Sequence, residues 1–163
     1  MQPEHSIEII HQIAELLITE QSQLCTAESC TGGLIAKSCT DIAGSSNWFD
    51  RGFVTYSNLS KIEMLDVQSG TLAENGAVSE AVVREMALGA IKKSAAQYAV
   101  AVTGIAGPDG GSVQKPVGTV WFGFAAQQRV TTEHRVFAGD RAQVREKSMR
   151  VALLGLLRQI RNK

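Results

Sequence analysis

The sequence predicts an α/β fold in which helices cover both faces of one mixed β-sheet. Short apolar segments with strand character alternate with amphipathic segments of helical period, which is the pattern of a layered sheet. A hairpin pattern late in the chain adds antiparallel pairing, so the sheet is not purely parallel. The 163 residues suffice for one domain with a substantial core. Because no linker or repeat divides them, we expect a single domain over residues 1–163.

The first third of the chain is predicted to hold two helices and two strands. Residues 6–20 place apolar side chains at helical spacing, opposite a polar face. Residues 23–27 have the pattern of a short strand, and residues 32–40 follow as a helix. Residues 49–56 are rich in aromatic and β-branched side chains, which favours a second strand.

The middle of the chain carries two capping boxes that mark helix starts. Ser60 and Thr71 are each followed three residues later by a glutamate. We therefore expect one helix to begin at Ser60 and another at Thr71. Residues 79–95 come next, and their apolar spacing predicts a long amphipathic helix.

The next segment combines a buried strand with a flexible loop. Residues 98–103 are a short apolar run that ends at a glycine, as is typical of a fully buried strand. The loop of residues 104–111 follows and is rich in glycine. Ligands bind at such places in α/β sheets, because the loops after the strands line a common edge.

A hairpin and a helix are predicted at the C-terminal end. Residues 117–126 and 129–137 are two strand patterns separated by a short glutamine turn, which is most simply a hairpin. Asp140, with Gln143 three residues later, forms a third capping box. We expect the last helix to begin there and to run to about residue 160.

Charge and composition exclude several classes of protein. Lysine plus arginine and aspartate plus glutamate both count 16, so we expect no nucleic-acid partner. No apolar run reaches the ~18 residues of a membrane helix, and the N-terminus lacks the basic and apolar regions of a signal peptide. Three cysteines without metal-ligand spacing indicate reduced thiols. We therefore expect a cytoplasmic protein with no membrane partner.

Residues 26–33 are the segment with the clearest chemical character. A strand pattern ends in Ser29, and the glycines at 32 and 33 open a helix. This arrangement would place the serine hydroxyl beside unpaired backbone N–H groups, which bind anions or a developing oxyanion. The alternative is that Ser29 only caps the helix. Ser29 fits neither standard hydrolase pattern, because Ala27 and Thr31 replace the glycines of Gly-x-Ser-x-Gly and Gly32 replaces the lysine of Ser-x-x-Lys.

Lys61 and Tyr56 are candidates to assist Ser29. In a helix capped by Ser60, Lys61 would lie at the positive end of the helix dipole, which makes its ammonium easier to deprotonate. A neutral lysine can take the serine proton as a general base. Tyr56 ends a strand five residues earlier and could orient Lys61 or donate to an oxyanion. The alternatives are a solvated surface lysine and a strand-end tyrosine with a hydrated hydroxyl.

The glycine loop and two arginines are candidates to bind an anionic ligand. The loop of residues 104–111 offers many N–H groups that could surround a phosphate, although it matches no nucleotide-binding fingerprint. Arg141 and Arg145 lie one turn apart on the predicted last helix, which suits a phosphate. The alternatives are a plain turn and a surface charge network.

Four motifs in this order resemble one known family. Residues 28–33, 52–61, 102–108 and 115–120 are similar to the CinA C-terminal domain family, and together they span nearly the whole chain. The resemblance implies a three-layer α/β/α sandwich with a mixed, largely parallel sheet. It also implies a homodimer that needs no metal or other cofactor.

The same resemblance implies an activity. Stand-alone family members of the PncC type convert nicotinamide mononucleotide (NMN) to nicotinate mononucleotide and ammonia in pyridine nucleotide recycling. The chain lacks the separate N-terminal domain of longer members, which favours this type. Ser29 would be the nucleophile, Lys61 the base and Tyr56 a supporting hydroxyl. We expect the substrate to be held by Glu28, Cys30, Thr31, Gly32, Gly33, Thr103, Gly104, Gly107, Arg141 and Arg145.

Two other functions fit the same residues. A non-catalytic module that senses a pyridine nucleotide would use the glycine loop and the arginines, with Ser29 as a helix cap only. A hydrolase of another amide would keep the serine and lysine but bind a different substrate.

Overall fold

A computed structural model of the protein describes residues 3–162 and contains one five-stranded sheet. The strand order is β2-β1-β3-β4-β5, in which β1 pairs in parallel with β2 and β3, and the other two pairs are antiparallel. Four strands therefore point the same way and only β4 is reversed, which confirms the mixed, largely parallel sheet. The strands are β1 (Leu24–Glu28), β2 (Phe49–Val54), β3 (Tyr98–Gly104), β4 (Thr119–Ala126) and β5 (Arg129–Val136).

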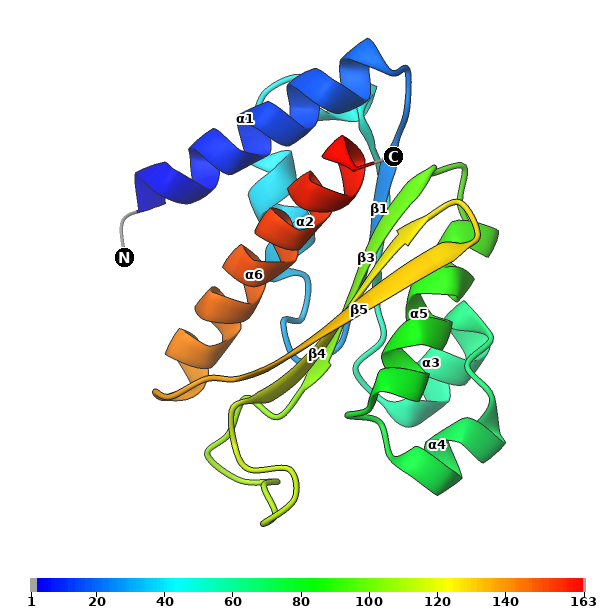
Figure 1. The fold of residues 1–163 in the computed structure, drawn as a ribbon, viewed down its shortest axis with the longest axis vertical. Helices are drawn as coiled ribbons and strands as arrows, with labels where there is room; N and C mark the ends of the chain where they lie inside the picture. Colours follow the sequence, from blue (N-terminus) through cyan, green and yellow to red (C-terminus); the bar gives the residue numbers. More distant parts are fainter. Residues whose placement is uncertain (1–2, 163) are drawn as a thin grey trace.

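Helices cover both faces of this sheet, as predicted. Figure 1 shows α1, α2 and α6 on one side and α3, α4 and α5 on the other. Within the described residues, no helix is long and apolar enough to cross a lipid bilayer. The helices are α1 (Pro3–Thr19), α2 (Leu34–Thr40), α3 (Asn58–Leu65), α4 (Ser69–Asn75), α5 (Glu80–Lys92) and α6 (Arg141–Arg161), with a short 3-10 turn at Ser45–Asn47. Residues 1, 2 and 163, which the single-domain prediction includes, lie outside the described range.

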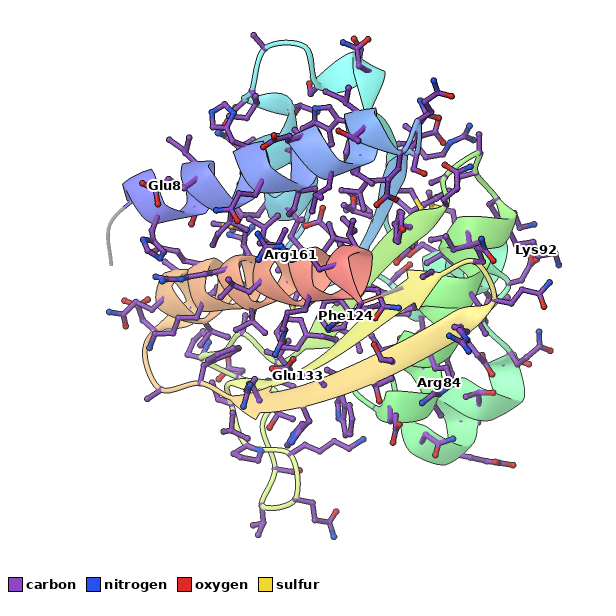
Figure 2. The ribbon with its side chains drawn as sticks, turned by 45° about the horizontal axis from the view of Figure 1, so that its top comes forward. Glu8, Arg84, Lys92, Phe124, Glu133 and Arg161 are labelled. Carbon is purple, nitrogen blue, oxygen red and sulfur yellow. The ribbon has the colours of Figure 1, made fainter. Side chains whose placement is uncertain are left out.

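The two faces of the sheet differ in side-chain size. The face toward α1, α2 and α6 carries large side chains, among them Phe124, which packs beneath Gly155 of α6 (Figure 2). The opposite face is lined by small residues, and a Cβ added at Gly123 would lie 2.9 Å from the carbonyl oxygen of Val83 on α5. The long α5 can therefore approach the backbone of the central strands closely.

Two predicted helix starts were wrong, and each has a physical reason. Helix α3 begins at Asn58 because Ser57 is its N-cap, with a hydroxyl that accepts the N–H of Ser60 at 3.1 Å. Helix α4 begins at Ser69, before Thr71, and the carboxylate of Glu85 on α5 accepts both the Gln68 N–H and the Thr71 hydroxyl. A tertiary carboxylate thus replaces the local capping box.

The expected features near the C-terminus are confirmed. The hairpin turns between Ala126 and Arg129, which are partners in the β4–β5 ladder. Asp140 accepts the N–H of Gln143, and the Gln143 side chain accepts the N–H of Asp140, both at 2.9 Å. This reciprocal cap fixes the start of α6 beside the long β3–β4 loop (Figure 1).

The order of the strands predicts where a ligand would bind. The chain leaves β1 toward β2 on one side and leaves β3 toward β4 on the other. The carboxyl ends of these adjacent strands therefore form a topological switch point, where α/β sheets bind ligands. Ser29 follows β1, and the glycine loop follows β3.

Candidate active site

Ser29 and Lys61 meet in a direct hydrogen bond. The Lys61 Nζ donates to Ser29 Oγ at 3.0 Å, although the residues come from different elements. Ser29 follows the central strand β1, whereas Lys61 lies in the second turn of α3. Both side chains are buried, with 8% of Ser29 and 1% of Lys61 exposed. The pair has the spacing of a nucleophile and its general base.

The amine of Lys61 is held by backbone carbonyls. Its Nζ also donates to the Thr55 carbonyl at 2.9 Å and to the Tyr56 carbonyl at 3.4 Å. Burial lowers the pKa of Lys61 below its usual 10.5, and Cys30 has a smaller, opposing effect. The helix dipole was expected to cause this shift, but Lys61 lies beyond the first turn of α3, so burial is the physical cause. The alternative of a solvated surface lysine is wrong.

The turn after Ser29 is held in an unusual backbone conformation. Gly32 and Gly33 have φ values of +57° and +96°, in the left-handed region that favours glycine. The Gly32 N–H donates to the Ser29 carbonyl at 3.0 Å, and within residues 3–162 the N–H groups of Cys30 and Thr31 have no acceptor on another residue. The N-cap of α2 is Gly33, without a side-chain cap, so Ser29 does not cap the helix.

Glu28 caps α2 from inside the protein. Its carboxylate is fully buried and accepts the N–H groups of Ile35 at 2.9 Å and Ala36 at 3.0 Å. The Thr26 hydroxyl donates to the same carboxylate at 3.3 Å. These bonds use the helix N–H groups that the sequence suggested for an anion. We therefore reassign Glu28 from substrate binding to capping of α2.

Tyr56 and Arg141 form the rim of the site. The Arg141 Nη2 donates to the Tyr56 hydroxyl at 2.8 Å, and its Nη1 donates to the Gly107 carbonyl at 2.9 Å. Tyr56 is 59% exposed, and only its backbone carbonyl touches Lys61. The expected contact between its phenol and Lys61 is therefore not made. Arg141 instead links the end of β2 to the glycine loop.

Arg145 lies one turn further along α6 and has different partners. Its Nε donates to the Cys30 carbonyl at 3.1 Å and its Nη2 to the Thr31 carbonyl at 3.0 Å. The side chain is half-buried against the turn that carries the nucleophile. The sequence predicts one anion site at Arg141 and Arg145, whereas in the structure the two side chains have different partners.

The β3–β4 loop closes the other side of the site. The Thr103 hydroxyl donates to the Ala77 carbonyl at 2.9 Å, which holds the end of β3 against the segment before α5. Gly104 lies in close contact, since an added Cβ would be 3.1 Å from Cys30 Sγ. Gly107 has a φ of +84°, in the left-handed region.

Ser29, Lys61, Tyr56, Arg141 and the glycine loop line a cleft of about 290 Å³. Of the predicted site residues, Glu28, Thr31, Gly32, Gly33 and Arg145 are not among its walls. Among the larger hollows, two of about 360 and 370 Å³ lie around Arg129 and Gln159 and a third of about 340 Å³ lies around Asp66, and none of them contains Ser29 or Lys61. The cleft is lined by Ser29, Cys30, Tyr56, Asn58, Lys61, Ala77, Val78, Thr103, Gly104, Ile105, Ala106, Gly107, Asp109, Gly110 and Arg141.

Sequence reasoning missed several groups in and beside this cleft. The carbonyl of Thr55, which lies behind the cleft wall, holds Lys61, but a backbone acceptor leaves no signal in the sequence. Asn58 and Asp109 line the cleft as well, and their places beside Lys61 and in the glycine loop were the available signals. No group of three or more His, Cys, Asp or Glu residues that could hold a metal ion is found in the described range.

Comparison with known proteins places this geometry in a family. The CinA C-terminal domain model matches residues 6–160. A protein named nicotinamide-nucleotide amidohydrolase PncC from Escherichia coli (strain K12) is 54% identical over 154 residues, which cover 94% of this chain and 93% of that protein. A protein of the same name from Enterobacter agglomerans is 62% identical over 82% of each chain.

Solved structures agree with the sequence comparison. The crystal structure of the competence/damage inducible protein CihA from Agrobacterium tumefaciens superposes with a TM-score of 0.94 at 43% identity, over 99% of both chains. The resemblance expected from the four motifs, and the layered fold that it implied, are thus confirmed. The chain belongs to the CinA C-terminal domain family.

Proposed function

We propose that this protein is a nicotinamide-nucleotide amidohydrolase that converts NMN to nicotinate mononucleotide and ammonia. The observation that carries the proposal is the buried 3.0 Å hydrogen bond between Lys61 Nζ and Ser29 Oγ, at the wall of an open cleft. The substrate comes from the relatives, since proteins 54% and 62% identical to this chain are named PncC nicotinamide-nucleotide amidohydrolases. We place the reaction in pyridine nucleotide recycling.

The first half of the reaction forms an acyl-enzyme. Neutral Lys61 takes the Ser29 proton while Oγ attacks the carboxamide carbon of NMN. The tetrahedral intermediate then collapses as its carbon–nitrogen bond breaks, and Lys61 returns the proton to the leaving nitrogen, so ammonia departs. This sequence leaves a nicotinoyl ester on Ser29 and a neutral Lys61.

The second half hydrolyses that ester. Lys61 removes a proton from water as the water oxygen attacks the ester carbonyl. The ester bond breaks, the proton passes to Ser29 Oγ, and nicotinate mononucleotide is released. The positively charged pyridinium ring withdraws electrons from the carbonyl in both steps, which would favour NMN over free nicotinamide.

The oxyanion of both tetrahedral states needs hydrogen-bond donors. The N–H groups of Cys30, which lines the cleft, and of the buried Thr31 have no acceptor on another residue within residues 3–162 and lie directly after the nucleophile. We assign the oxyanion to them, because removal of one such donor typically costs about 3 kcal/mol of transition-state stabilisation. The Tyr56 hydroxyl oxygen accepts from Arg141, which leaves its own O–H free to donate to a bound substrate.

Arg141 is the residue best placed to bind the 5′-phosphate. It lines the cleft, whereas Arg145 does not. Its guanidinium already bonds neutral oxygens of Tyr56 and Gly107, and a phosphate is a stronger acceptor for the same N–H groups. Ala106 and Gly107 of the glycine loop also line the cleft, and their N–H groups, which have no acceptor among the described residues, would supply further donors.

The non-catalytic alternative assigns Ser29 to helix capping. Against that reading, α2 is capped by Glu28 and begins after Gly33, and Ser29 Oγ instead accepts from Lys61. The expected homodimer and cytoplasmic location stay predictions, which light scattering and cell fractionation would test.

The test is to incubate purified protein with NMN and to follow ammonia together with the product by mass spectrometry. We expect ammonia and a product in which oxygen has replaced the amide nitrogen. Ser29→Ala should abolish both without lowering the melting temperature, whereas Ser46→Ala, at an exposed serine outside the cleft, should not change the rate. NMN that is bound but not hydrolysed would favour the sensing module, and hydrolysis of another carboxamide alone would correct the substrate.

A further inference from the structure

Arg145 donates two hydrogen bonds to backbone carbonyls instead of extending into solvent. Its Nε and Nη2 donate to two successive carbonyls, those of Cys30 and Thr31, at 3.1 and 3.0 Å. Both carbonyls belong to the turn that directly follows Ser29. A planar guanidinium that holds two neighbouring carbonyls fixes the orientation of both peptide planes, which a single contact would not do.

One of these contacts controls where a free N–H group points. In a planar trans peptide the N–H is directed opposite to the C=O. The carbonyl of Cys30 points to Arg145, so the N–H of Thr31 in the same peptide is directed away from it. This N–H has no acceptor within the described residues, and it is one of the two assigned above to the oxyanion.

Arg145 also brings an unneutralised charge to the turn. Within residues 3–162 it has no carboxylate partner, and its only hydrogen bonds are those to the two carbonyls. The guanidinium packs on Gly32, where an added Cβ would lie 3.5 Å from Nη2. The Arg145 charge also affects Cys30, which lines the cleft. Burial raises the pKa of the Cys30 thiol to about 11, and the positive charge of Arg145 acts to lower it.

We propose that Arg145 is a positioning residue, which orients the turn after Ser29 for attack and for oxyanion binding, and not a ligand of the substrate phosphate. The inference rests on the proposed function in one respect, namely that Ser29 is the nucleophile. It separates the roles of two arginines on α6, because Arg141 faces the cleft and Arg145 faces the backbone of the nucleophile turn.

The test measures the reactivity of Ser29 without the natural substrate. Phenylmethanesulfonyl fluoride is uncharged, and its sulfur forms a bond to Oγ as fluoride leaves and Lys61 takes the hydroxyl proton. The labelling rate is read by mass spectrometry for the unmodified protein, Arg145→Gln, Arg145→Lys and Arg150→Gln. Arg150 is a matched control, since it is half-buried on the same helix, does not line the cleft and has no hydrogen bond or ion pair in the described chain.

We expect Arg145→Gln to lower the labelling rate and kcat for NMN about a hundredfold, the usual effect of a misplaced reacting group. The KM for NMN should change by less than about threefold, which a phosphate ligand would not allow. Arg145→Lys keeps the charge but not the two-pronged contact and should lose about tenfold. This conservative variant decides the matter if the glutamine variant does not fold. Arg150→Gln should label at the normal rate.

Three results would overturn the inference. Normal labelling of both Arg145 variants would show that the turn does not depend on Arg145, and a raised KM with normal labelling would make Arg145 a substrate ligand. An unmodified protein that is not labelled at Ser29 overturns the nucleophile assignment and this inference with it. Labelling without NMN turnover contradicts only the proposed substrate, and the labelling rates of the Arg145 variants still decide the role of Arg145.

Discussion

Replacement of Glu28 by glutamine separates a structural role from a role in substrate binding. The carboxylate is fully buried and accepts the N–H groups of Ile35 and Ala36, one on each oxygen. Glu28→Gln keeps the shape of the side chain, so it opens no cavity. The amide retains one acceptor oxygen and turns an NH₂ group toward the second backbone N–H.

The size of the effect follows from these contacts. A hydrogen bond to a charged group contributes about 1.5–3 kcal/mol, and the abandoned N–H remains buried. We therefore expect Glu28→Gln to lower the free energy of unfolding by about 3 kcal/mol, a large part of the 5–15 kcal/mol typical of a domain. For a chain of this length the melting temperature should fall by roughly 6–12 °C.

The assay is urea unfolding followed by far-ultraviolet circular dichroism, beside NMN kinetics on the folded variant. Glu63→Gln is the control, because Glu63 is exposed on α3 and should change the stability by less than about 0.5 kcal/mol. A Glu28→Gln variant as stable as the control would refute the capping argument. A normal stability with a KM for NMN raised about tenfold would return Glu28 to the substrate-binding residues.

Three further predictions concern the base, the packing of α5 and the phosphate. Because burial lowers the pKa of Lys61, kcat/KM should rise about tenfold per pH unit while the lysine is protonated, and it should level off below pH 10.5. A kcat/KM that stays flat from about pH 6 to 10 contradicts Lys61 as the base. Gly89→Ala should destabilise the protein by about 1–3 kcal/mol in urea unfolding, since its Cβ would overlap the Leu65 carbonyl, whereas Gly70→Ala has open space and should not destabilise it. Arg141→Gln should raise the KM for NMN about tenfold or more but leave that for nicotinamide riboside, which has no phosphate; equal effects on both would argue against a phosphate contact.

The sequence was a good guide wherever a local pattern decides the structure. The reciprocal cap of Asp140 and Gln143 and the hairpin of β4 and β5 both depend on neighbours in the chain, and both are confirmed. The start of α4 was missed because its N-terminal groups bind Glu85, which is distant in sequence. Propensity and capping patterns contain no term for such a tertiary partner.

The sequence predicted which residues form the candidate site better than it predicted the contacts between them. Ser29 and Lys61 were expected to meet, and in the structure Lys61 Nζ lies 3.0 Å from Ser29 Oγ. The partners of Tyr56, Arg141 and Arg145 were not foreseeable, because long side chains one turn apart on a helix can reach opposite sides of a loop. The spacing of two arginines does not show which of them faces the cleft to bind a ligand and which holds the backbone of the turn after Ser29.

The surroundings of Lys61 explain how a lysine can act as a base below its usual pKa. A neutral amine has two N–H groups and one lone pair. In the structure Nζ donates to all three oxygens; once it loses the proton that faces Ser29, the Thr55 and Tyr56 carbonyls keep its two remaining N–H groups and its lone pair is directed to the Ser29 hydroxyl. A carboxylate in place of those carbonyls would orient the amine equally well but would hold its third proton and raise the pKa. Neutral acceptors combined with burial orient the amine and favour its neutral form.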